Sequence, residues 1–277
     1  MVEKSLEAHF IKCLKEGNTK KALYIVELLG DKVNMLYDHR SLLFWASSHG
    51  NVEVVEALIE NGAKVNEKDE WGDTALINAS QKGHVDVVKT LIEKGAKVDE
   101  KDNDGDTALI WASSHGNVEV VKTLISRGAK VDEKDNNGET ALMGASRNGH
   151  VEVIEALIDA GAKVDEKDNH GETALIWASL CGHVEVVKTL ISRGAKVDEK
   201  VNDGKTALIW ASANGCVEVV KVLLDVGADV TIANNDGITA IDTASDDEMK
   251  KMLKEALRKQ KQNEKTFIKE IRDFFGR

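Results

Sequence analysis

The chain has 277 residues, of which 31% are charged and only 4% aromatic, and its formal net charge is −11. This acidic balance disfavours nucleic-acid binding, which depends on neutralising phosphates with Lys and Arg. No stretch approaches the roughly 20 apolar residues of a membrane span, and the first 15 residues do not resemble a signal peptide. Cys13, Cys181 and Cys216 have no framework spacing, so we expect free thiols and a cytoplasmic, reducing location.

A threonine recurs every 33 residues without insertion, and Ser41 takes the same place one step earlier. A fixed period of 20 to 50 residues indicates a stacked repeat architecture. The recurring residues are Thr74, Thr107, Thr140, Thr173, Thr206 and Thr239.

The repeat at 104–136 shows what one unit builds. Thr107 is a good N-cap for a short helix over 108–115, and Gly116 can end that helix in the left-handed conformation. A second helix is predicted over 118–127, because Val118, Val121, Leu124 and Ile125 fall on one face. The polar run that follows predicts a loop or hairpin finger. Two such short helices are marginal alone, so neighbouring pairs must stack.

Three elements of this repeat resemble the ankyrin repeat. They are the Thr-Ala-Leu opening, the Gly-His or Gly-Asn between the helices, as at Gly83-His84, and the Gly-Ala-Lys-Val-Asp after the second helix. The family's opening is Thr-Pro-Leu-His, whereas this chain has Thr-Ala-Leu-Ile or Thr-Ala-Leu-Met and no proline. The resemblance implies an all-α repeat solenoid of helix-turn-helix pairs with protruding β-hairpin or loop fingers. It also implies a binding face made by the first helices and the fingertips.

In chain order, residues 5–37 read as a degenerate first repeat, broken at Gly17-Asn18. Its exposed side carries Lys12, Lys15 and Lys20, as a terminal repeat requires. We predict an array over 5–257, comprising this capping repeat at 5–37, regular repeats at 38–70, 71–103, 104–136, 137–169, 170–202 and 203–235, and a C-terminal cap at 236–257.

The last residues, 258–277, are predicted to form a basic amphipathic helix. Its apolar residues recur at i, i+1, i+4, i+7 and i+8, namely Phe267, Ile268, Ile271, Phe274 and Phe275. This stripe could fold back on the last repeat, enter a partner's groove or lie on an acidic membrane. We favour folding back, since solenoid ends need capping. The polar link at 259–263 could instead continue one long helix.

No catalytic or metal-binding set is evident, and no cofactor is predicted. His49 and His115 are equivalent residues two repeats apart, too far to share a metal. Cys181 and His183 lack the further ligands that zinc needs. The acidic residues of the fingers recur in the same places in every repeat and are interpreted as a solvated surface.

A binding site is predicted where the repeats differ. The stretches 107–136 and 173–202 differ at four positions, two of them at the end of the first helix. Residues at the finger tips can also vary simply because no selection acts on them. Trp71 at a finger tip is nevertheless an expected anchor for a partner. A shared slot of the first helix holds Trp45, Trp111, Trp177 and Trp210, for which packing is the favoured interpretation. The predicted partner-binding residues are Trp71, Asp73, Asp104, Asp106, Ser114, His115, Glu139, Arg147, His170, Glu172, Leu180, Cys181 and Lys205.

The predicted function is a non-enzymatic protein-binding scaffold, monomeric, with a partner on a concave acidic face. Because the fingers are acidic, the partner is expected to present a basic segment. The alternatives are a consensus-like or designed scaffold without a native partner, and a groove-binding small-molecule or enzymatic accessory protein. Membrane contact by the C-terminal helix is the less favoured interpretation.

Overall fold

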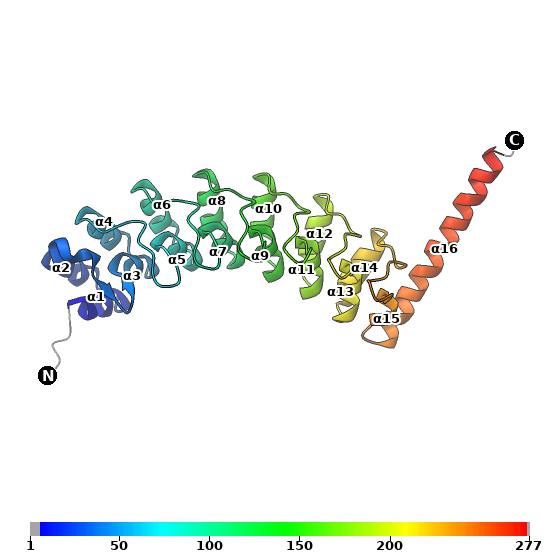
Figure 1. Cartoon of the computed structure of the whole chain (residues 1–277), viewed down its shortest axis with the longest axis horizontal. Coiled ribbons are helices and arrows are strands. Elements are labelled where there is room, and N and C mark those ends of the chain that lie inside the picture. Colours follow the sequence, from blue (N-terminus) through cyan, green and yellow to red (C-terminus); the bar gives the residue numbers. More distant parts are fainter. Residues whose placement is uncertain (1–5, 276–277) are drawn as a thin grey trace. The chain divides into compact units, whose positions relative to one another are not determined.

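A computed structural model describes residues 6–275 (Figure 1). Residues up to Ala145 together with Glu152–Lys163 form one compact unit, called here the N-terminal unit. Ser146–Val151 together with the residues from Val164 onward form the second, the C-terminal unit.

Helices make up nearly all of the regular structure. The first repeat contains α1 (Leu6–Lys15), α2 (Thr19–Leu29), a 3-10 turn η1 (Gly30–Asn34), β1 (Leu36–Tyr37) and β2 (Arg40–Ser41). The paired helices are α3 (Leu42–Ser48) and α4 (Val52–Glu60), α5 (Ala75–Lys82) and α6 (Val85–Glu93), α7 (Ala108–Ser114) and α8 (Val118–Ser126), α9 (Ala141–Asn148) and α10 (Val151–Asp159), α11 (Ala174–Cys181) and α12 (Val184–Ser192), α13 (Ala207–Ala213) and α14 (Val217–Asp225). The chain ends with α15 (Ala240–Thr243) and α16 (Asp247–Phe275).

The threonine caps predicted from the period are confirmed. Thr107 Oγ1 accepts a hydrogen bond from Ile110 N at 3.3 Å, and Thr74 Oγ1 accepts one from Ile77 N at 3.2 Å. Each cap satisfies an otherwise unpaired N–H of the first turn. The predicted left-handed ending is present at Gly116, where φ is 72°. Helix boundaries therefore follow from bonds that span only three or four residues.

The core lies between stacked helix pairs. In the repeat at 104–136 the buried side chains of α8 are Val120, Val121 and Leu124, while Val118 is only half-buried. The buried face is thus rotated slightly from the predicted one, because the second helix contacts both its own first helix and the helices of neighbouring repeats.

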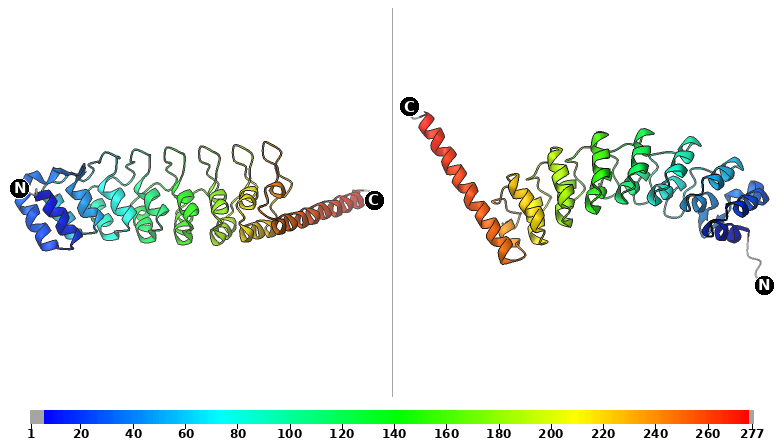
Figure 2. Two further views of the ribbon diagram at one scale, coloured as in Figure 1. Left: turned by 90° about the horizontal axis from the view of Figure 1, so that it is seen from below. Right: turned by 180° about the vertical axis from the view of Figure 1, so that it is seen from behind.

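Within each unit the loops between helix pairs project as fingers (Figure 2), and hydrogen bonds join neighbouring fingers. Asn136 N donates to Asp104 O at 2.9 Å, and Asn136 Nδ2 donates to Asn103 O at 2.9 Å. Gly105, with φ at 87°, makes this approach possible, because a Cβ there would lie 2.7 Å from Asn136 N. The glycine at this place is therefore required both for its conformation and for its lack of a side chain.

The acidic residues of the fingers are mostly bonded, so their interpretation as a solvated surface is only partly right. Glu133 lies 3.0 Å from Lys101 Nζ and 3.1 Å from Lys130 Nζ. Hydrogen bonds from these two lysines lower the pKa of Glu133. Asp99 Oδ1 accepts a bond from Lys130 N of the next repeat at 3.1 Å. Much of the negative charge predicted to attract a partner is thus neutralised within the array.

The first finger is a short antiparallel hairpin of β1 and β2. Its turn residues Asp38 and His39 both have positive φ, 53° and 62°, the conformation of a type I′ turn. Asp and His accept this conformation more readily than most residues. The hairpin places Arg40 at the base of the first finger.

The prediction that the C-terminal stripe folds back on the last repeat is wrong. Helix α16 continues without a break from Asp247 to Phe275 (Figure 1). The five residues of the stripe are exposed. The physical reason is that the polar link at 259–263 contains Lys, Gln and Asn but no glycine or proline to end the helix. Only the start of α16 caps the array, with Met249 and Leu253 fully buried.

No helix in the described range 6–275 is long and apolar enough to cross a membrane. Among the same residues, no group of three His, Cys, Asp or Glu side chains is arranged to hold a metal ion.

Candidate functional site

An aspartate at the end of each Asp-Glu-Lys-Asp run builds the fingertip. Asp102 Oδ1 accepts backbone hydrogen bonds from Asp104 N at 3.0 Å and Asp106 N at 2.8 Å. Its other oxygen, Oδ2, accepts from Trp111 Nε1 at 2.8 Å. One carboxylate therefore shapes the tip and ties it to the first helix of the same repeat.

A cluster of one cation and three aromatic rings lies beside the first two fingers in the N-terminal unit. The Arg40 guanidinium carbon is 4.6 Å from the ring centroids of both Phe44 and Trp71 and 5.8 Å from that of Trp45. Arg40 Nε also donates to Asp69 Oδ2 at 3.1 Å. Since the Asp69 side chain is only 1% exposed, this pair holds the arginine rigidly. Trp71, predicted as an anchor, is 50% exposed and is supported from one side by Arg40.

The acidic strip, defined as Asp73, Asp104, Asp106 and Glu139, follows the same side of the N-terminal unit. Burial raises the pKa of Asp106 to about 7, with further contributions from the carboxylates of Asp102, Asp135, Asp104 and Glu139. Burial likewise raises the pKa of Asp73 to about 6, partly offset by Arg40. The neighbours that shift the pKa of Asp106 are all carboxylates among the described residues, and none of them is a cation. The strip is therefore short of positive charge at its centre.

The tryptophans that share one position of the first helix are half-buried in each repeat that has one, consistent with packing on one side and solvent on the other. Trp45 Nε1 donates to Tyr37 O at 3.0 Å, and Trp111 Nε1 donates to Asp102. The His115 ring packs against Trp111 in a tilted arrangement, with ring centroids 5.6 Å apart and an angle of 42° between the ring planes. Because each of these residues is only half-buried, packing within the array is compatible with contact to a partner.

Two further tryptophans of this slot lie in the C-terminal unit, and both carry a cation on the ring. Arg147 lies 4.1 Å above Trp177, and Lys205 Nζ lies 4.2 Å above Trp210. The indole Nε1 atoms of Trp177 and Trp210 are buried and have no hydrogen-bond partner among the described residues. At Trp210 the reason is Val201, which replaces the aspartate of the other fingers; Trp177 lacks the bond although Asp168 is present.

Of the thirteen predicted residues, the structure brings together four in the acidic strip, with Trp71 at the neighbouring cluster. Ser114 is half-buried and His115 exposed at the end of α7. In the C-terminal unit Arg147 and Lys205 lie on tryptophan rings, His170 is exposed at a tip and Glu172 is half-buried. Leu180 and Cys181 end α11, where the Leu180 carbonyl lies 4.0 Å from Cys216 Sγ.

Arg40 and Asp69 were not predicted, although the period offered a signal for the first. Arg40 lies 33 residues before Asp73, so it belongs to the same variable slot as Asp106, Glu139 and Lys205. Asp69 occupies a slot that is also aspartate at 102, 135 and 168, and nothing in the sequence marks it as the partner of Arg40.

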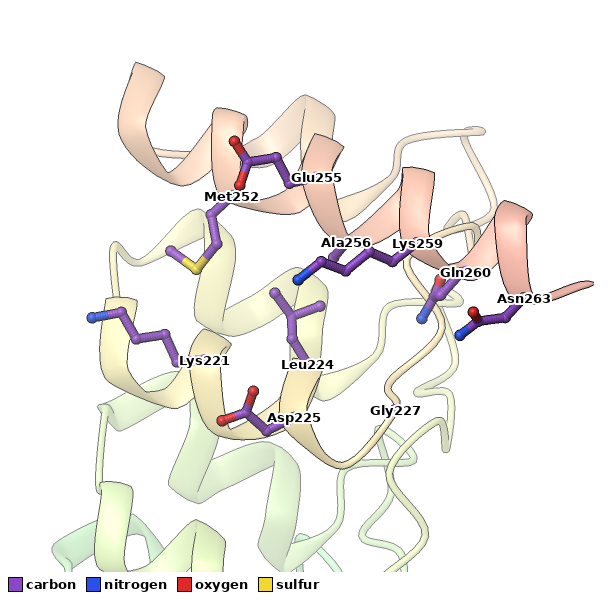
Figure 3. A pocket seen from close by; sticks show the side chains of 10 residues that line it. All are labelled: Lys221, Leu224, Asp225, Gly227, Met252, Glu255, Ala256, Lys259, Gln260 and Asn263. Carbon is purple, nitrogen blue, oxygen red and sulfur yellow. The ribbon is translucent and has the colours of Figure 1, made fainter.

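A groove of about 480 Å³ lies between α14 and α16 in the C-terminal unit (Figure 3). Leu224 and Met252 line it, with Lys221, Glu255 and Lys259 at its edges. Gln260 closes one end: its Nε2 donates to Ala228 O at 2.7 Å, and its Oε1 accepts from Val230 N at 3.2 Å. Asn34 and Asn66 hold the backbone of their neighbouring repeats with the same pair of bonds.

Comparisons with known proteins agree with this architecture. A family model described as ankyrin repeats (three copies) matches residues 43–135, 128–201 and 197–266. The crystal structure of the human ASB11 ankyrin repeat domain is similar, with a TM-score of 0.73, 30% identity, and coverage of 78% of this chain and 98% of that one. The ankyrin repeat domain of Bcl-3, described as a unique member of the IkappaB protein family, has a TM-score of 0.69 and 26% identity, covering 79% of this chain and 100% of that one. The comparison with curated proteins gave no match.

Proposed function

Because the chain belongs to the ankyrin repeat family, we propose that it is a protein-binding module whose partner presents a basic segment to the acidic strip of the N-terminal unit. Ankyrin repeat domains are generally non-enzymatic protein–protein interaction modules. Stacked repeats of this kind provide an extended surface to which each repeat contributes a few variable side chains.

The observation that carries this proposal is the charge imbalance at Asp106. Its carboxylate is half-buried among four others, and burial together with their repulsion raises its pKa to about 7. A Lys or Arg side chain from a partner would supply the missing positive charge and favour the ionised form. Glu133 of the same repeat does not share this imbalance, because Lys101 and Lys130 already pair with it.

Trp71 supplies the apolar anchor beside the strip. A half-exposed tryptophan held in place before binding loses little conformational freedom when a partner covers it. Arg40 provides this support, since its guanidinium lies against the ring while Asp69 fixes its Nε. In the C-terminal unit we extend the proposed contacts to Arg147, His170, Glu172, Leu180, Cys181 and Lys205, and we propose that the protein acts as a monomer.

The test is selection of a random dodecapeptide display library against the full chain at pH 8. The selected peptides should be enriched in Lys and Arg. Their affinity should fall by at least about tenfold, or 1.4 kcal/mol, for Asp106→Lys and for Trp71→Ala. It should also weaken as the pH falls from 8 to 6, because Asp106 takes up a proton and the cation then meets a neutral group.

Glu56→Lys is the matched control, because it makes the same charge change on an exposed site of α4, the second helix of its repeat. The proposal is wrong if the selected peptides lack basic residues, or if Asp106→Lys and Glu56→Lys weaken them equally.

A further inference from the structure

Helix α16 has two apolar segments separated by the polar residues 258–266, and only the first segment has a partner within the described residues. Met249 and Leu253 are fully buried against the last repeat. Phe267 follows Met249 by five turns at about 3.6 residues per turn, so it lies on the same face. Beyond Gln260 this face leaves the array, and Phe274 and Phe275 are 76% and 80% exposed. The exposed stripe, defined as Phe267, Ile268, Ile271, Phe274 and Phe275, is a contiguous apolar surface in water.

A basic edge runs along α16 from Lys254 to Arg272 and flanks this stripe over its last part. Its residues recur at helical spacing and all are exposed: Lys254, Arg258, Lys261, Lys265 and Arg272. Over 259–275 the helix has five Lys or Arg and three Asp or Glu, in a chain whose net charge is −11. Large apolar side chains next to a row of cations, with low overall hydrophobicity, are typical of helices that lie in the interface of a lipid bilayer.

A second copy of the chain fits this surface poorly. In a parallel pair, the partner helix would run alongside the whole of α16 on its apolar face. It would then need the surface at Met249 and Leu253, which the last repeat already covers. In an antiparallel pair with two-fold symmetry, the basic edge of one helix would lie on the same side as the basic edge of the other. The two edges, both containing Arg272, would therefore come together. Like charges in such positions oppose pairing.

We propose that the exposed part of α16, residues 259–275, binds an anionic lipid surface. The Phe and Ile side chains enter the region between headgroups and acyl chains, while the basic edge contacts lipid phosphates. The helix would lie in the membrane plane and would not span the bilayer. This surface is distinct from the acidic strip, and its occupant is opposite in charge to the basic segment proposed for the strip, so each proposal can fail without the other.

The experiment uses the full chain with vesicles of phosphatidylcholine containing roughly a third phosphatidylglycerol, and with vesicles of phosphatidylcholine alone. Flotation should recover the protein with anionic vesicles and not with neutral ones, and recovery should fall as salt is raised. Phe274→Ser combined with Phe275→Ser, and separately Lys261→Glu with Lys265→Glu and Arg272→Glu, should each weaken binding by at least about tenfold.

The matched control is Lys12→Glu with Lys15→Glu and Lys20→Glu, which makes the same charge change on exposed lysines of the first repeat and should retain binding. Circular dichroism checks that every variant is folded. The proposal is overturned if anionic vesicles recover no protein at low salt, or if the tail variants bind like the control. It is also overturned if light scattering without lipid finds a dimer that the two serine substitutions dissociate, since the stripe would then belong to a second copy.

Discussion

The indole nitrogen of Trp111 donates a 2.8 Å hydrogen bond to Oδ2 of Asp102, the residue whose other oxygen holds the fingertip. This bond connects the tip to the first helix, so the position of the acidic strip depends on a tryptophan outside it. Trp210 occupies the same slot in the C-terminal unit, but Val201 stands where its acceptor would be.

The first prediction compares the same substitution at these two sites. Trp111→Phe removes the bond and leaves Oδ2 of Asp102 without its donor, so it should lower the free energy of unfolding by about 1–2 kcal/mol more than Trp210→Phe does. Both changes lose similar apolar area, and each serves as the control for the other. Urea denaturation measures the difference, and equal losses would contradict the role assigned to Asp102.

The second prediction concerns the pH dependence of stability at Asp106. Its folded-state pKa is raised from 3.8 to about 7. Between these values the folded state keeps a proton that the unfolded chain has released, so stability falls as the pH rises through this window. The substitution Asp106→Asn removes this loss of stability, because an amide does not ionise. After discounting for solvent screening, the variant should be more stable than the parent by about 1–2 kcal/mol at pH 8.

That advantage should shrink as the pH falls below about 7 and should vanish once the pH is well below 3.8, where the carboxyl is protonated in both states. Thermal melts at several pH values test this, with Glu56→Gln on the exposed side of α4 as the control. An advantage that stays constant with pH would show that titration of Asp106 is not its source.

The third prediction concerns the arginine that supports Trp71. Arg40→Gln removes the charge beside a buried carboxylate, leaving Asp69 with only its backbone donors. We expect a loss of about 1–3 kcal/mol in the free energy of unfolding and a change in Trp71 fluorescence. Arg40→Lys should restore charge but not the planar stacking, and should recover only part of the loss. Wild-type stability in Arg40→Gln would contradict the arrangement.

The fourth prediction concerns how α16 is held. Gln260→Ala removes both bonds to the Ala228–Val230 backbone and should cost about 1–2 kcal/mol. The Val230 amide should exchange with deuterium faster, because its acceptor is gone. Gln262→Ala, on an exposed site of the same helix, is the control. If both variants behave alike, the burial of Met249 and Leu253 alone holds the helix.

Much of the fold was predictable because its instructions are local. Thr107 caps a helix through a bond to the third residue ahead, and Gly116 ends that helix with its own backbone angle. The 33-residue period then repeated these signals, so repeat length and helix ends could be predicted without knowing any contact between repeats. Thr107 and Gly116 need only neighbours within about four residues to act.

The candidate site was predictable only in part, because its properties depend on residues far apart in sequence. By sequence alone, Glu133 and Asp106 are equivalent negative charges on the fingers. In the structure, Glu133 is paired with Lys101 of another repeat, whereas Asp106 lies among carboxylates and has no paired cation in the described part of the chain. The sequence by itself determined the repeat, the helix caps, the variable slots and the amphipathic face of α16. Only the tertiary structure decided which carboxylates are neutralised, that Arg40 supports Trp71, and that the stripe after Gln260 stays exposed. These outcomes depend on where the stacked repeats bring side chains together, and a fixed period in sequence does not specify which of the resulting charges will find a partner.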